Sequence, residues 1–270
     1  SNIEGDPYSM KVSDVFSILV QIAPLSYAMD YDNIGILIGS QEQTVTKICL
    51  ALDITSAVVD EAMQMGTELI ISHHPVIFEP LKQINPATAS GSILYQLIQH
   101  NIAAICLHTN LDAAKSGVNS ILAHQLGVEN TRIIEPLGED AHGPYGIGLY
   151  GNLNQNRPLS SFLPFVKDTL GCDGLRYHDA GKPVFHVAVG GGSCGDFVHL
   201  APVLEFDTLV TADVKHNHFI TAKEYGVNLI DAGHFYTENP VIRYLYVVLK
   251  EKLSLDVHIA KANIAPVRFY

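Results

Sequence analysis

Three polar clusters rich in histidine and carboxylate side chains follow three apolar segments of the chain. They are residues 72–75 (SHHP), 108–112 (HTNLD) and 234–238 (HFYTE). Imidazole and carboxylate ligands together suit divalent metals such as Zn, Mn, Fe or Co, and a shared carboxylate can bridge two ions. Each histidine taken alone could be a helix cap or a hydrogen-bonded core residue. Three such clusters in equivalent places favour a metal site instead.

The adjacent histidines His73 and His74 predict where their strand ends. Successive side chains on a strand point to opposite faces, so both imidazoles can converge on one site only if the strand has already ended. Pro75 follows directly and supports an end at this point, because proline cannot donate to the hydrogen-bond ladder of a sheet.

The other two clusters share one spacing between the histidine and the carboxylate. His108 and Asp112 are four residues apart, and so are His234 and Glu238. In a helix this spacing places both side chains on one face. We therefore expect each of these pairs to act together if a helix begins at the cluster.

Short apolar runs alternate with helical patterns and must position these clusters. The expected strands are 47–53 (KICLALD), 68–72 (ELIIS), 102–107, 184–189 (VFHVAV), 208–211 (TLVT) and 227–230 (VNLI). The expected helices are 12–22, 56–65, 93–100, 197–204 and 218–224. Continuous apolar strands between helices are typical of a largely parallel sheet covered on both faces. In such sheets, ligands collect beyond the carboxyl ends of the strands, where the polar clusters fall.

The same strand and helix order occurs in both halves of the chain. It predicts an α/β fold of two related lobes with mostly parallel sheets. We expect the first lobe at residues 10–137 and the second at 138–270, with a glycine-rich entry at 138–171 and a C-terminal helix that could pack back on the first lobe. Residues 1–9 precede the first methionine and are expected to be an added leader outside the fold.

Composition limits the classes of function. The chain has 270 residues, with 16 Lys+Arg against 28 Asp+Glu and a formal net charge of −12, which argues against binding a nucleic acid polymer. The longest apolar runs are far shorter than the ~20 residues that cross a bilayer, so we expect no membrane span. Four cysteines without C-x-x-C spacing are typical of reduced thiols in a cytoplasmic protein.

Weaker candidates have two interpretations each. The loop 190–195, with its glycines, could cradle a phosphate or be a tight turn from strand to helix. Asp30, Asp32 and Asn33 could assist the metal site or shape a turn, and residues 215–218 could line a cleft or begin a solvated helix. The chain has no G-x-S-x-G elbow or Walker loop that would indicate another chemistry.

At these motifs the chain resembles the Nif-three-like family of dinuclear-metal-centre hexameric proteins, also labelled GTP cyclohydrolase I type 2 homologues. The resemblance covers residues 10–270. It rests on residues 30–35 (DYDNIG) with Gly39, 71–75 (ISHHP), 108–112 (HTNLD), and Gly233 and His234 with Glu238. The family usually has Trp where this chain has Tyr31. Its usual Gly-Glu after the strand at 208–211 is Ala212 and Asp213 here, which keeps the charge.

The resemblance implies a site for two divalent ions, Zn, Mn or Fe, in the cleft between the lobes, with an exchangeable water or hydroxide. The implied ligands are His74 and Asp112 for one ion, His73 and His234 for the other, and Glu238 as the bridge. His108 would be the candidate catalytic residue, which orients the site or transfers a proton, a role that metal sites commonly require.

Two functions remain open at this point. The first is a metal-dependent hydrolase of a small anionic substrate that is phosphorylated or nucleotide-like. The alternative is a non-catalytic metal-binding adaptor or regulatory protein. For both, the resemblance implies a homo-oligomer, a hexameric ring, and we expect a cytoplasmic protein with no nucleic acid or membrane partner.

Overall fold

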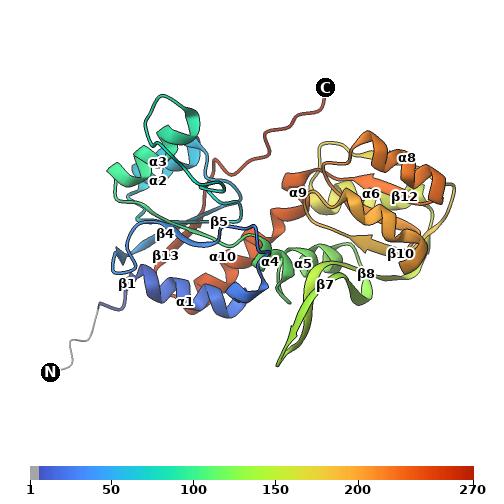
Figure 1. Cartoon of the computed structure of the whole chain (residues 1–270), viewed down its shortest axis with the longest axis horizontal. Coiled ribbons are helices and arrows are strands. Elements are labelled where there is room, and N and C mark those ends of the chain that lie inside the picture. The colour runs from blue at the N-terminus through green and yellow to red at the C-terminus, as the bar shows by residue number, and fades with distance from the viewer. Residues whose placement is uncertain (1–5) are drawn as a thin grey trace. The chain divides into compact units, whose positions relative to one another are not determined.

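Two main β-sheets organise the chain, which the computed structural model describes from residue 6 to residue 270 (Figure 1). Residues 1–5, the first part of the expected leader, lie outside the described residues. The chain divides into two compact units. Unit 1 comprises the residues up to Leu111 together with Ile242–Ile264, and unit 2 comprises Asp112–Val241 and Ala265–Tyr270. The expected lobe boundary between residues 137 and 138 falls inside strand β7 (Glu129–Asp140) of unit 2.

Unit 1 is a five-stranded sheet with helices on both faces. Its elements are β1 (Met10–Lys11), α1 (Val12–Ile22), η1 (Leu25–Tyr27), β2 (Gly35–Ile38), β3 (Thr44–Val45), β4 (Lys47–Ala51), α2 (Ser56–Met65), β5 (Leu69–Ser72), α3 (Ala89–Gln99), β6 (Ala103–Cys106), most of α10 (Pro240–Lys252) and β13 (Asp256–Ile259). The strand order is β13-β4-β5-β6-β2, parallel except for the antiparallel edge strand β2, and β1 pairs with β3 separately. The C-terminal strand β13 therefore completes a sheet that begins near the N-terminus.

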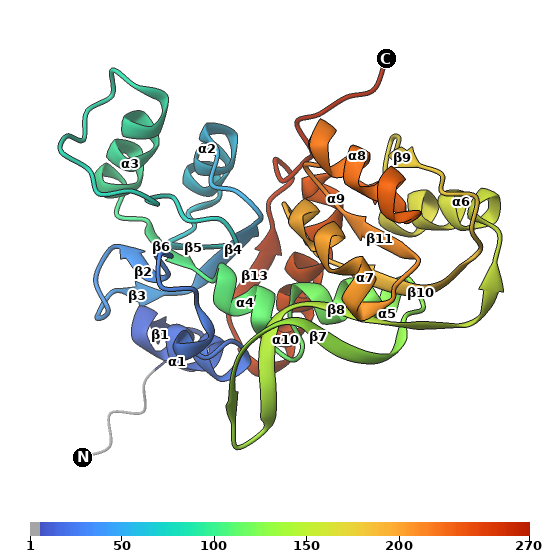
Figure 2. The same ribbon diagram turned by 45° about the vertical axis from the view of Figure 1, so that its right-hand side comes forward.

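Alternating side chains of this sheet build its core. Cys49, Ile70 and Ala104 face α2 and α3, and Figures 1 and 2 draw α1 and α10 on the opposite side. Helix α2 has a clear start and stop. The Thr55 hydroxyl accepts a hydrogen bond from the third N–H of the helix at 3.2 Å, and Gly66 ends it with φ of 68°, a left-handed conformation that costs glycine little.

Unit 2 is a six-stranded mixed sheet. Its elements are α5 (Val118–Gln125), β7, β8 (Gly143–Arg157), α6 (Leu159–Leu170), β9 (Arg176–His178), β10 (Val184–Val189), η2 (Gly195–Leu200), α7 (Ala201–Leu204), β11 (Thr208–Thr211), α8 (His216–Tyr225), β12 (Asn228–Asp231) and α9 (His234–Glu238). Helix α4 (Thr109–Ala113) begins in unit 1 and ends in unit 2. The strand order is β7-β8-β10-β11-β12-β9, and β10, β11 and β12 are parallel.

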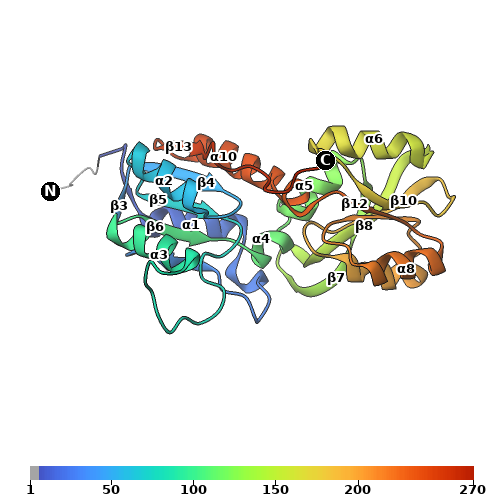
Figure 3. The same cartoon turned by 90° about the horizontal axis from the view of Figure 1, so that it is seen from above.

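The central strands of unit 2 are buried on both faces. Val187 and Val189 of β10 pack with α5 and α6, whereas Ala188 packs with η2, α7 and α8. Figure 3 shows α6 and α8 on opposite sides of this sheet. Each fully buried valine or leucine stabilises the fold by about 1.5–3 kcal/mol relative to exposure.

The α/β architecture with parallel central strands is confirmed. The strands expected at 184–189 and 208–211 and the helix expected at 56–65 coincide with β10, β11 and α2. The long β7–β8 hairpin was not expected, because most of β7 is exposed and polar and carries no alternating apolar pattern. Among the helices of residues 6–270, none combines the length and apolar character needed to cross a membrane.

Candidate metal centre

In unit 1, the carboxyl ends of three neighbouring parallel strands bring polar side chains to one edge of the sheet. Strands β4, β5 and β6 are paired so that their last residues lie in register. Asp53 follows β4, His73 and His74 follow β5, and His108 follows β6. Because parallel strands end on the same side of a sheet, these four residues lie close together despite their distance in sequence.

Three imidazoles form the centre of this group. The ring centroids of His73 and His74 are 4.9 Å apart, and His108 lies 5.3 Å from the first and 5.6 Å from the second. One ring nitrogen from each histidine lies within 4.8 Å of the others, so the three could hold a metal ion. Both adjacent imidazoles converge because β5 ends at Ser72, as their sequence predicts.

Hydrogen bonds at Nδ1 fix the rings of the first two histidines. His73 Nδ1 donates to the carbonyl of Leu107 at 2.8 Å, and His74 Nδ1 lies 2.8 Å from a carboxylate oxygen of Asp53. An acceptor at Nδ1 places the proton there, so the lone pair is on Nε2, the atom that would bind an ion. Histidine ligands in metal sites are commonly oriented in this way.

The third histidine, His108, is fixed by Asp32. A carboxylate oxygen of Asp32 lies 2.8 Å from His108 Nδ1, and its other oxygen accepts hydrogen bonds from the backbone N–H and the hydroxyl of Thr109, at 2.9 and 2.5 Å. Burial alone would raise the pKa of Asp32, but these hydrogen bonds outweigh burial and lower the pKa to about 2. The carboxylate thus stays charged and holds both the ring and the start of α4.

Unit 2 repeats this construction at the ends of its own parallel strands. Ser193 follows β10, Asp213 follows β11 and His234 follows β12 and begins α9. Glu238 is one helical turn beyond His234 on the same face, and the two side chains form an ion pair. The expectation that the spacing of four places this pair together is confirmed.

His234 is held from both sides. Its Nδ1 lies 2.6 Å from Asp213, and its Nε2 contacts Glu238. Burial opposes the charge of the ring, but the hydrogen bonds and charges of the two carboxylates prevail and raise the pKa of His234 to about 9. Asp213 also accepts a hydrogen bond from the Ser193 hydroxyl at 2.5 Å and has a φ of 51°, which is uncommon for a residue other than glycine.

Glu238 is a buried carboxylate against a glycine. Its side chain is 4% exposed, and one of its oxygens lies within 4.8 Å of a carboxylate oxygen of Asp112. Gly192 has a φ of 74°, and a Cβ at this position would overlap the carboxylate of Glu238 and approach His234 to 3.2 Å. Glycine is therefore required beside this pair.

The glycine loop is occupied by hydrogen bonds within the protein. The backbone N–H groups of Gly190, Gly191, Gly192 and Cys194 donate to atoms of unit 2 at 2.9–3.1 Å. These groups do not face outward to receive a phosphate, so the structure favours a tight turn that supports Glu238.

His218, in the first turn of α8, is held by hydrogen bonds within the protein. His218 is buried, its Nδ1 accepts a hydrogen bond from the N–H of Lys215 at 3.0 Å, and its Nε2 lies 2.8 Å from Asp196. Within residues 6–270, neither Lys215 nor His218 belongs to a group that could hold a metal ion. These contacts favour a role in starting the helix.

A cavity of about 610 Å³ in unit 2 has Asp112 in its wall. Lys115, Arg132, Tyr145 and Tyr150 also line it, so the wall combines two cationic and two aromatic side chains. Lys115 lies 3.9 Å from Asp140, whereas Arg132 is exposed and has no ion-pair partner in the part of the chain that the structure describes. This cavity has the size and lining to accept a small anionic molecule.

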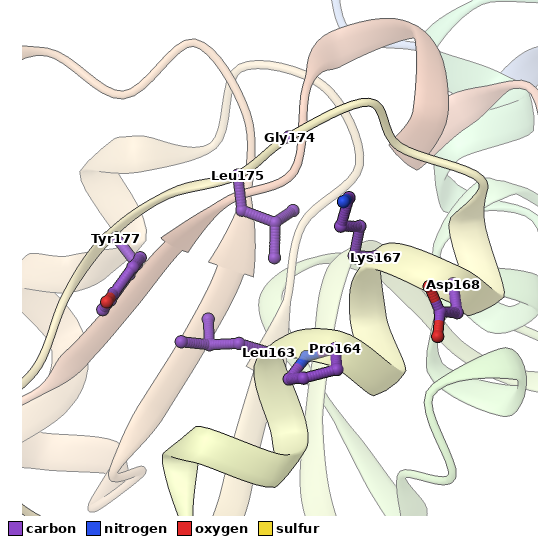
Figure 4. A pocket seen from close by; sticks show the side chains of 7 residues that line it. All are labelled: Leu163, Pro164, Lys167, Asp168, Gly174, Leu175 and Tyr177. Atoms are coloured by element: carbon purple, nitrogen blue, oxygen red, sulfur yellow. The ribbon is translucent and has the colours of Figure 1, made fainter.

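A second hollow of about 370 Å³ lies elsewhere in unit 2 (Figure 4). Figure 4 shows Leu163 and Lys167 of α6 facing Leu175 on the segment that leads into β9. The described residues that line this hollow include none of the expected metal ligands, and its surface is mostly apolar.

Each unit thus positions three of the expected site residues: His73, His74 and His108 in unit 1, and Asp112, His234 and Glu238 in unit 2. Sequence reasoning did not identify Asp53 as the partner of His74, and gave no role to Asp213. Both follow the ends of parallel strands, as the histidines do, and this shared position was the signal that could have identified them.

The chain thus consists of two α/β units. Each unit carries imidazole or carboxylate groups at the ends of its parallel strands, and these groups could bind metal ions. The family model of Duf34/NIF3 (NGG1p interacting factor 3) matches residues 10–266, so the chain belongs to this family. This confirms the resemblance seen in the motifs.

Individual relatives agree with this membership over nearly the whole chain. A protein of Clostridium perfringens named "GTP cyclohydrolase 1 type 2 homolog" is 35% identical over 249 residues, covering 92% of this chain and 94% of its own. A protein of the same name from Clostridium acetobutylicum is 34% identical over 271 residues, covering 97% and 99%.

Solved structures share the fold. The crystal structure of a hypothetical protein of Staphylococcus aureus has a TM-score of 0.88 and 31% identity, covering 98% of this chain and all of its own. That of a Bacillus cereus protein related to NIF3 has a TM-score of 0.87 and 25% identity, covering 97% and 99%.

Proposed function

We propose that the protein is a metal-dependent hydrolase of a small phosphorylated or nucleotide-like substrate. Two divalent ions, Zn, Mn or Fe, would be held by the residues that both units position: His73, His74, Asp112, His234 and Glu238. The observation that carries the proposal is the orientation of the histidines, each of which has Nδ1 against an oxygen acceptor. Four imidazoles oriented alike in this way are typical of metal ligands and their immediate neighbours.

The donor set fits divalent ions. Neutral imidazoles and carboxylates are the ligands preferred by first-row metals of this class, and a buried carboxylate such as Glu238 is suited to bridge two positive charges. Bound ions would lower the pKa of water toward neutrality and polarise the electrophile that it attacks. A divalent ion in place of the proton on His234 would also bring more positive charge to the two carboxylates that surround this ring.

The residues beyond the ligands have distinct roles in this proposal. His108, with Asp32 at its Nδ1, would keep a proton on that nitrogen and offer Nε2 to accept or return a proton of the reaction. Asp53 and Asp213 would hold the rings of His74 and His234 in one orientation. A hydrolase needs such proton carriers, whereas a site that only binds metal has less use for them.

The cavity beside Asp112 supports an anionic substrate. Arg132 and Lys115 would contact phosphate oxygens, and Tyr145 and Tyr150 would pack against an aromatic base. The name of the relatives, GTP cyclohydrolase 1 type 2 homologue, makes GTP the first substrate to test.

The test combines metal analysis with turnover. Freshly purified protein would be analysed for bound metals, loaded with Mn, Fe or Zn, and assayed with GTP and simple phosphoesters, comparing Glu238→Gln with wild type. Glu224→Gln on the exposed face of α8 is the matched control. We expect at least two ions per chain and turnover that Glu238→Gln reduces at least about 100-fold. Failure to bind metal, or turnover unaffected by Glu238→Gln, would refute the proposal.

The same experiment separates the enzyme from an adaptor. Stoichiometric metal without turnover of any nucleotide or phosphoester would instead support a non-catalytic metal-binding protein. Under either outcome we propose a cytoplasmic homo-oligomer, and sedimentation of the purified chain would test the hexameric ring.

A further inference from the structure

A second cluster of metal-ligand side chains lies inside unit 1. Cys49 of β4, Glu61 of α2 and His258 of β13 each place one ligand atom within 4.8 Å of the others. Cys49 lies in the middle of β4, four residues before Asp53, which is about 13 Å along a strand. The cluster is therefore separate from the histidines at the carboxyl end of the sheet.

The pairing of two strands brings the cysteine and the histidine together. Strands β4 and β13 are parallel, and Cys49 lies directly opposite His258 in their register. Residues opposite each other in neighbouring strands point to the same face of a sheet. On that face Cys49 packs under α2, the helix that carries Glu61.

His258 has an unusual environment. Both of its ring nitrogens are buried, and within residues 6–270 neither has a hydrogen-bond partner. Buried polar atoms are almost always paired, and an unpaired one commonly marks a missing water or ion. Burial also lowers the pKa of His258, so the ring is held in the neutral form that binds metals. The residue as a whole is partly exposed, although its ring nitrogens are buried.

Glu61 is oriented toward this position by the backbone. Its two carboxylate oxygens accept hydrogen bonds from the N–H groups of Lys261 and Ala262, at 2.9 and 3.1 Å, just after β13 ends. Each oxygen keeps a further lone pair for a ligand bond. The carboxylate is thus fixed by the same segment that carries His258.

We propose that Cys49, Glu61 and His258 bind one Zn²⁺ ion. One thiolate, one imidazole and one carboxylate form a zinc-like donor set of three, with water as the fourth ligand. On binding, the Cys49 S–H bond breaks, a Zn–S bond forms and the proton passes to solvent. The ion would tie β4, α2 and β13 together and so fasten the C-terminal strand to the sheet.

Without a cation, the thiol resists ionisation. Burial, and next the charge of Glu61, raise the pKa of Cys49 to about 12. A divalent ion lowers this pKa, because its positive charge stabilises the thiolate and neutralises the carboxylate of Glu61. This explains how a cysteine that is fully buried and 0% exposed can still be a ligand.

Titration with Co²⁺ tests the proposal, because a thiolate ligand gives a charge-transfer band in the near ultraviolet. The histidine and carboxylate ligands of the proposed hydrolase site contain no sulfur and give no such band. We expect a band with the intensity of one thiolate-bound Co²⁺ per chain, equal in wild type and in Glu238→Gln, that excess Zn²⁺ removes. Its presence does not depend on the hydrolase being correct.

Variants assign the band to the cluster. Cys49→Ser should abolish it, and His258→Gln should weaken Co²⁺ binding at least about 10-fold. Cys194→Ser is the control, because Cys194 is the most exposed of the four cysteines and should leave the band unchanged. Absence of the band at saturating Co²⁺, or its persistence in Cys49→Ser, would overturn the proposal. If Cys49→Ser does not fold, an unchanged Co²⁺ affinity in His258→Gln would overturn it instead.

Discussion

Asp32→Asn tests whether the carboxylate beneath His108 holds this part of unit 1 together. Asp32 accepts four hydrogen bonds, from His108 Nδ1, from the N–H and hydroxyl of Thr109, and from the N–H of Asn33. An asparagine has one oxygen and one NH₂ group, so its NH₂ group would face N–H or O–H donors that now bond to a carboxylate oxygen. The variant loses both the charge and part of the bonding.

The magnitude follows from the pKa of Asp32, which falls from 3.8 to about 2 in the folded protein. At 1.36 kcal/mol per pKa unit, this shift corresponds to about 2–3 kcal/mol of stability at pH 7. Because the folded pKa is the lower one, the stability is present above pH 4 and is lost as pH falls toward 2. By linkage, roughly half of this contribution to the free energy of unfolding remains at pH 3.

Hydrogen exchange measured by mass spectrometry as a function of urea would report this stability for each unit. Peptides from β6 report unit 1, and peptides from β11 of unit 2 are an internal reference. We expect Asp32→Asn to lower the free energy of unfolding of unit 1 by about 2–3 kcal/mol at pH 7, with metal removed by a chelator. Asp30→Asn, at an exposed carboxylate two residues earlier, should have little effect.

Two results would refute the reasoning. One is a change below about 0.5 kcal/mol at pH 7, the usual range of a surface substitution. The other is a loss that stays the same from pH 7 to pH 3, because a contribution from the charge of Asp32 must shrink over that interval.

Three further predictions follow from unit 2. Asp213→Asn removes the charge at Nδ1 of His234, so it should lower the pKa of that ring from about 9. It should also weaken Zn²⁺ binding about 10- to 100-fold, measured in competition with a chromophoric chelator, and an unchanged affinity would contradict this. Gly192→Ala should destabilise the protein by about 1–3 kcal/mol in calorimetry, because of its positive φ and its contact with Glu238, and a wild-type melting temperature would argue against this strain. Burial raises the pKa of the Cys172 thiol to about 12, so iodoacetamide at pH 8 should modify it at least about 100-fold more slowly in the native protein than in urea; equal rates would exclude a protected thiol.

The sequence was most informative where one segment determines its own structure. The strands at 184–189 and 208–211 are short and mostly apolar, and Gly190 and Asp207 each mark one boundary, which favours a buried strand. The pairing of His234 with Glu238 needed only a helix at that place. The mostly polar hairpin of β7 and β8 carries no such pattern and was missed.

Side-chain pairs between strands could not be predicted in the same way. The contact of His74 with Asp53 depends on β4 and β5 being neighbours, and the sequence does not state that order. The approach of Cys49 to His258 depends on a C-terminal strand joining the edge of the first sheet. Such contacts depend on which strands are neighbours in the sheet, and local sequence patterns do not specify that order.

The joining of β13 to β4 also sets an order of events during synthesis. The edge of β4 is completed by a segment so distant that the hydrogen bond from Leu52 to Asn263 links residues 211 positions apart. At the usual ribosomal rate, β4 waits roughly 10–40 s for its partner, while most of unit 2 has already emerged. During that time the nascent chain presents an unpaired, apolar strand edge, the kind of surface that chaperones protect and that seeds aggregation.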